Sequence, residues 1–297
     1  MIAAALALLL LQPDPDSLQR IFVDALQRRI QQYGMADTRT AQAARDLGLF
    51  LKTHGNPQDA RIVLSQAIQI DEAAFGPKAL QTLHDAAELA AISPPEIATP
   101  LWLRAAESPE SGLAPDAFDA LAAIRGAAGD SAGAVRYYRK ALAAEQAISG
   151  KRSPQAAVRM AALAMVLKPA EGIPMLMDVV EINRDTLGPR HPETATTATN
   201  LAGMLVNAGR PDAALPLLNG AIKVFEITIG PGHPRVATAT SILAFAMKKK
   251  GDRKAAEALY RKALAIDEKV YGPNHEQTLA DRKTLNDFLQ EPAQPHK

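Results

Sequence analysis

Three histidines recur in the C-terminal half of the sequence at a regular spacing that could belong to a metal site. His191, His233 and His275 are 42 residues apart, and each follows a Gly-Pro pair by one residue. Zinc needs ligands about 2 Å from one centre, whereas packed helices in successive units lie about 10 Å apart. We therefore predict that these histidines have a role at three repeat junctions and do not share a metal ion.

Other residues that could do chemistry lack the surroundings that catalysis needs. The sequence has no cysteine, which excludes disulfides and thiolate metal sites. It has no nucleophile elbow, phosphate-binding loop or paired-glycine fingerprint, because Gly230-Pro231-Gly232 follows a predicted helix and is one of the junctions. The sequence therefore predicts no enzyme activity, no catalytic or metal-binding residues and no cofactor.

The strongest run of charge is Lys248, Lys249 and Lys250. One interpretation is a site for an acidic partner. The other is stabilisation of a helix C-terminus, where each cation contributes about 0.3–1 kcal/mol, and lysines late in other predicted helices favour it. Over the whole chain, 33 Lys and Arg residues balance 32 Asp and Glu residues, which argues against a nucleic-acid partner.

The elements that position these residues follow the same 42-residue period. Each junction glycine, at 188, 230 and 272, precedes a leucine by thirteen residues. A fixed period of this length is typical of stacked repeats. Amphipathic segments separated by Gly and Pro breaks predict an all-α fold of thirteen to fifteen helices with no strands. A hydrophobic content of 47% allows such an array to bury a core.

The N-terminus has an unbroken apolar run from Ile2 to Leu11. The run is too short to span a bilayer, but it has the length of a signal-peptide core. No Lys or Arg precedes it, and no clear cleavage site follows. Residues 1–16 are therefore either a signal peptide or an apolar segment packed on the array. We slightly favour export to the periplasm over a cytoplasmic location, and we predict no stable membrane span.

The remaining chain divides into repeats of unequal length. Residues 17–34 form a predicted N-terminal capping helix, and residues 35–290 form six helical hairpins followed by a C-terminal capping helix. In the second and fourth hairpins, the small residues of the two helices are eight positions apart instead of twelve, which corresponds to about one lost helical turn. Residues 108–115 are a candidate joint, and residues 291–297 are a predicted disordered tail.

Small and large residues alternate along both helices of the best-preserved units. The fifth unit has Leu201-Ala202-Leu205 in its first helix and Ala214-Leu218-Ala221 in its second. This pattern resembles the tetratricopeptide repeat. The 42-residue length and the GP-x-HP junction resemble the kinesin light chain type, which is widespread in bacterial proteins. The resemblance implies a right-handed superhelical solenoid of helix-turn-helix repeats.

The resemblance also implies a function. The first helices of such repeats line a concave groove that binds a peptide or protein segment. The chain is therefore predicted to be a monomeric scaffold or adaptor for an unknown protein or peptide partner. The alternative is a structural or assembly subunit that self-associates through its repeats. The predicted groove residues of the fifth and sixth units are Thr199, Asn200, Gly203, Asn207, Ser241, Phe245, Lys248 and Lys249.

Overall fold

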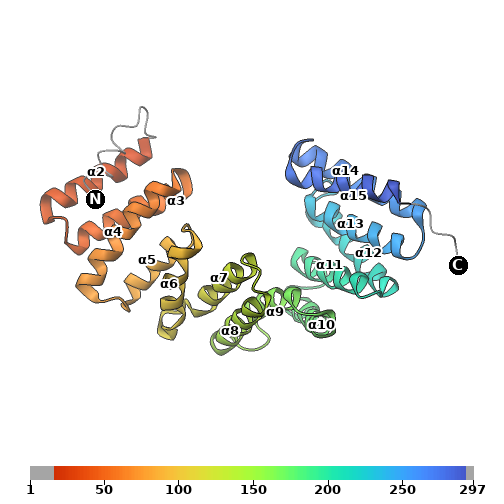
Figure 1. The fold of residues 1–297 in the computed structure, drawn as a ribbon, viewed down its shortest axis with the longest axis horizontal. Helices are drawn as coiled ribbons and strands as arrows, with labels where there is room; N and C mark the ends of the chain where they lie inside the picture. The colour runs from red at the N-terminus through yellow and green to blue at the C-terminus, as the bar shows by residue number, and fades with distance from the viewer. Residues whose placement is uncertain (1–16, 292–297) are drawn as a thin grey trace. The chain divides into compact units, whose positions relative to one another are not determined.

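The computed structural model describes residues 17–291, and every regular element within them is a helix (Figure 1). Fourteen α-helices and one short 3-10 helix follow one another, and this part of the chain contains no strand. The all-α prediction is confirmed. The helices are α2 (Ser17–Tyr33), α3 (Thr38–His54), α4 (Pro57–Phe75), α5 (Leu80–Ala90), α6 (Pro95–Ala106), η1 (Pro109–Ser111), α7 (Ala114–Ala127), α8 (Ser131–Ser149), α9 (Pro154–Val166), α10 (Pro169–Thr186), α11 (Pro192–Asn207), α12 (Pro211–Thr228), α13 (Pro234–Lys249), α14 (Arg253–Tyr271) and α15 (Glu276–Gln290).

The chain forms two compact units that divide between Ala144 and Glu145, within α8. Neighbouring helices pair in sequence order, and the pairs α3–α4, α9–α10, α11–α12 and α13–α14 are in close contact. The candidate joint at 108–115 contains η1, and its role as a joint stays a prediction. The candidate signal segment, residues 1–16, lies outside the described residues. Within the described range, no helix combines the length and apolarity that crossing a bilayer requires.

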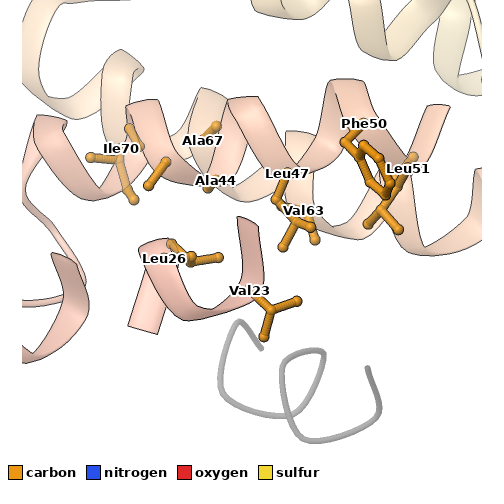
Figure 2. Close-up of a cluster of buried hydrophobic side chains, with 12 residues drawn as sticks. Val23, Leu26, Ala44, Leu47, Phe50, Leu51, Val63, Ala67 and Ile70 are labelled. Carbon is orange, nitrogen blue, oxygen red and sulfur yellow. The ribbon is translucent and has the colours of Figure 1, made fainter. Parts of the chain in front are cut away.

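The core of the first compact unit joins α2 to the first hairpin, which α3 and α4 form. Leu26 of α2 and Leu47 of α3 are fully buried, and Val23 and Val63 are nearly so. Figure 2 shows Leu47 beside Val63, with the two α2 side chains across from them. Burying each such side chain stabilises the fold by about 1.5–3 kcal/mol. Helix α2 therefore covers an apolar face that the first hairpin alone would leave exposed.

Small residues lie where paired helices cross most closely. Ala202 of α11 and Ala214 of α12 are both completely buried in the full-length fifth unit. In the fourth unit, α9 has only 13 residues, against 16 in α11. Gly172 of α10 stands in the place of Ala214, and it packs against α9 so closely that no side chain fits. The shortened hairpin thus requires a glycine at this crossing.

Replacing Gly172 by alanine is expected to lower the free energy of unfolding by about 1–3 kcal/mol through overpacking. A Cβ atom there would lie 2.6 Å from the carbonyl oxygen of Ala164 and 2.7 Å from the Sδ atom of Met204. The matched control is Gly220→Ala in α12, where a Cβ would meet no atom within 4 Å. That change is expected to stabilise by about 0.5–1 kcal/mol, because alanine favours a helix. Urea unfolding of both variants tests the difference, and equal stabilities would contradict the close crossing.

Candidate functional site

The three regularly spaced histidines begin three different helices. His191, His233 and His275 are the N-cap residues of α11, α13 and α15. Each Nδ1 atom accepts a hydrogen bond from the backbone N–H two residues later, at 3.1, 3.1 and 3.2 Å. These bonds satisfy N–H groups that would otherwise lack a helical partner. The predicted junction role is confirmed. Residues 17–291 contain no group of three or more His, Asp or Glu side chains placed to hold a metal ion.

The second compact unit of the chain, which begins at Glu145, contains a cavity of about 540 Å³ between its helices. Its lining combines apolar side chains with a few amide and hydroxyl groups, which is the usual make-up of a ligand pocket. The helices that contribute belong to the fourth, fifth and sixth repeats and to α15. The lining residues are Met165, Leu167, Pro169, Asn200, Gly203, Met204, Asn207, Ser241, Ile242, Phe245, Tyr260 and Thr284.

Five of the eight residues predicted for a groove lie together in this lining: Asn200, Gly203, Asn207, Ser241 and Phe245. The side chains of Asn200 and Asn207 make no hydrogen bond to the rest of the described chain. Their amide groups are therefore available to a ligand. We call these five residues the α11–α13 groove.

Thr199 lies elsewhere. Its side chain is only 4% exposed, and its hydroxyl donates a 2.9 Å hydrogen bond to the carbonyl oxygen of Ala195 in the same helix. Threonine readily bonds to the preceding helical turn in this way. Thr199 is thus part of the packing beneath the groove and does not line it.

The three lysines of the charged run contact different side chains. Lys248 forms a 2.7 Å ion pair with Glu291, and Lys250 forms a 2.6 Å ion pair with Asp212. The Nζ atom of Lys249 lies 5.2 Å from the centre of the Phe245 ring, a cation–π distance. Neither Lys248 nor Lys249 lines the cavity. Only Lys249 of the three keeps an ammonium group without an ion pair among the described residues.

Several lining residues were missed by the sequence reasoning. Met165, Leu167 and Pro169 come from the shortened fourth hairpin, whose turn faces the groove because α9 ends early. Tyr260 aligns with packing residues of other units and is 6% exposed. Burial and, secondarily, the charge of Glu291 raise the pKa of Tyr260 to about 12, so its hydroxyl stays protonated and can donate a hydrogen bond.

The family-model match falls within the second compact unit, whereas the structural likenesses extend over most of the chain. A family model described as tetratricopeptide repeat matches residues 168–227 and 194–269. No curated protein sequence matches the chain. The likeness to solved structures is a likeness of fold, since all sequence identities are low.

Three structures illustrate that likeness. The APC/C hetero-tetramer Cut9-Hcn1 matches at 16% identity and a TM-score of 0.55, covering 92% of this chain and 46% of that chain. A signal transduction ATPase with a tetratricopeptide repeat sensor from Pyrococcus horikoshii matches at 12% identity and a TM-score of 0.50, covering 94% and 43%. Kinesin light chain TPR-like repeats from Podosopora anserina match at 20% identity and a TM-score of 0.42, covering 79% and 98%. The family-model match identifies residues 168–269 as tetratricopeptide repeats, and the helical hairpins of the described residues share the fold of the first two structures.

Proposed function

We propose that the chain is an interaction module that binds a peptide or protein segment in the α11–α13 groove. Tetratricopeptide repeats generally mediate protein–protein interactions. The observation that carries the proposal is the 540 Å³ cavity, in which the unpaired amides of Asn200 and Asn207 lie beside the apolar ring of Phe245.

The chemistry of this lining fits a polypeptide ligand. A side-chain amide can both donate to a backbone carbonyl and accept from a backbone N–H. The apolar surface of Met204, Ile242 and Phe245 offers a place for one or two side chains of the ligand. Gly203 adds no side chain to the floor between them. Together these groups could hold an extended or helical segment through its backbone and an apolar anchor.

The charge beside the groove favours an acidic ligand. Lys249 is exposed next to Phe245, whereas Lys248 is neutralised by Glu291. We therefore expect that Lys249, and Lys248 only in a secondary role, attracts a nearby carboxylate of the partner. Such an attraction between exposed charges is screened over about 10 Å at 0.1 M salt. Lys249→Glu should accordingly weaken binding more at low salt than at high salt.

The groove is tested with variants of matched repeat positions. Partners are captured on the immobilised chain, identified by mass spectrometry and titrated by calorimetry. Asn200→Ala is expected to weaken binding by about 1–3 kcal/mol, the cost of leaving a buried partner group unpaired. Phe245→Ala should also weaken it. Leu49→Ala is the control, because Leu49 occupies in the first repeat the position that Phe245 occupies in the sixth. Both residues lie fifteen positions after the junction glycine.

Two outcomes would contradict the proposal. In the first, Leu49→Ala loses the partner while Asn200→Ala and Phe245→Ala bind it like the wild type. In the second, light scattering shows concentration-dependent oligomers that both groove variants leave unchanged, and no other protein is captured. That second result would support a self-associating structural subunit.

A further inference from the structure

A buried contact recurs at every well-formed junction between units. The residue five positions before the junction glycine packs against the residue nine positions after that glycine, on the next helix. In most units the two side chains are complementary: Asn183 donates a 3.0 Å hydrogen bond to Thr197, and Phe225 shares an apolar cluster with Ala239. The pairs at these positions are Asp71–Asp85, Glu145–Arg159, Asn183–Thr197, Phe225–Ala239 and Asp267–Asp281.

In the first repeat, one arginine donates to both of the carboxylates that face each other. Arg45 of α3 donates to Asp71 at 2.7 Å and to Asp85 at 2.5 Å. Both carboxylates are only 1% exposed. The side-chain amide of Gln81 donates to Asp85 as well, at 3.2 Å. One guanidinium group thus donates hydrogen bonds to two buried carboxylates.

The sixth unit has the same acids without the arginine. Asp267 is 3% exposed, and its Oδ1 atom has no hydrogen-bond partner among the described residues. Gln277 donates to Asp281 at 3.4 Å, as Gln81 does to Asp85. The residue at the position of Arg45, eleven after the junction glycine, is Ser241. Ser241 is much shorter, and it lines the 540 Å³ cavity.

We propose that Asp267 and Asp281 bind the guanidinium group of an arginine side chain of a protein partner, in the place that Arg45 fills in the first unit. The planar guanidinium group carries five N–H donors and can bond two carboxylates at once. Ser241, which lines the cavity of the α11–α13 groove, carries no guanidinium group that would occupy this place. The inference deepens the proposed function and rests on it for the nature of the partner.

One further observation favours an arginine over a metal ion, and another describes the protonation of the pair. Asp267 and Asp281 are the acids of this contact, and no third His, Asp or Glu completes a metal-binding group among the described residues. Burial, with the hydrogen bond to Asp281, raises the pKa of Asp267 to about 7. The carboxyl is therefore partly protonated near neutral pH, and an entering guanidinium releases that proton to the solvent.

The test uses a blocked tripeptide, acetyl-Gly-Arg-Gly-amide, titrated into the full chain and followed by amide chemical shifts. Its matched control contains citrulline, which has nearly the shape of arginine but no charge. The arginine peptide is expected to shift the amide signals around Asp267, and the citrulline peptide is not. Asp267→Asn should weaken the binding roughly tenfold or more, because it removes a charged hydrogen-bond acceptor.

Ser241→Arg provides an independent variant. Its new guanidinium should bridge Asp267 and Asp281 as Arg45 bridges its own pair, raise the melting temperature and abolish binding of the tripeptide. Asp287→Asn, at an exposed position of α15, should leave the binding unchanged. Circular dichroism confirms that each variant is folded.

The inference is overturned if the tripeptide gives no saturable shifts, if citrulline binds equally, or if Asp267→Asn or Ser241→Arg binds like the wild type. Binding of manganese at Asp267 without binding of the arginine peptide would overturn it too. These results would leave the groove proposal intact, because Asn200 and Phe245 are tested separately with the captured partner. Conversely, the tripeptide titration does not depend on how Asn200→Ala and Phe245→Ala change binding of the captured partner.

Discussion

Arg45→Met is expected to lower the free energy of unfolding by about 3–5 kcal/mol, the usual effect of removing one member of a buried ionic group. Methionine keeps the apolar stem of arginine, but it leaves Asp71 and Asp85 facing each other without a cation. Both carboxylates are 1% exposed, so most of the compensation for their charge comes from the guanidinium. Burial already raises the pKa of Asp71 in the presence of Arg45. Urea unfolding at neutral pH measures the loss.

Two controls separate the buried charge from ordinary packing. Arg235→Met removes the ion pair between Arg235 and Glu193, whose side chains are 43% and 50% exposed, and it should cost at most about 1 kcal/mol. Combining Arg45→Met with Asp71→Asn and Asp85→Asn should recover much of the stability, because no uncompensated charge remains. An Arg45→Met variant as stable as Arg235→Met would contradict this account.

The repeat fold could be predicted from the sequence because its signals are local and periodic. The Gly-Pro junctions end one helix and begin the next, as Gly188 and Gly230 do between α10 and α11 and between α12 and α13. The junction histidines were assigned to the repeat by spacing alone. Their capping bonds required the structure, because a histidine before a Pro could equally have turned its ring to solvent.

The candidate groove was only partly predictable. Residues at equivalent repeat positions have different environments, as Arg45, Thr199 and Ser241 show. Arg45 is held by two acids from α4 and α5, Thr199 bonds to its own helix, and Ser241 faces the cavity. The contribution of Met165 and Leu167 depends on how the shortened hairpin packs against α11. Such contacts between helices have no signature within a single repeat.

The buried acid of the sixth unit should make stability fall as the pH rises. Burial and the hydrogen bond to Asp281 raise the pKa of Asp267 from an ordinary value of 3.8 to about 7. Between these values the folded state binds more protons than the unfolded state, so the free energy of unfolding declines from about pH 4 to pH 7. Since one pKa unit is worth about 1.4 kcal/mol, we expect a decline of about 2–4 kcal/mol from this carboxyl.

Asp267→Asn should remove that decline. The asparagine amide keeps the shape of the protonated acid and can donate to Asp281, but it has no proton to lose. We therefore expect the variant to match the wild type near pH 4 and to exceed it by about 2–4 kcal/mol at pH 8. Asp287→Asn, which changes an exposed carboxylate of α15, should alter stability by less than about 0.5 kcal/mol at either pH. Urea unfolding at the two pH values decides the matter, because a destabilised Asp267→Asn at pH 8 would mean that the charged carboxylate stabilises the folded protein, contrary to a raised pKa.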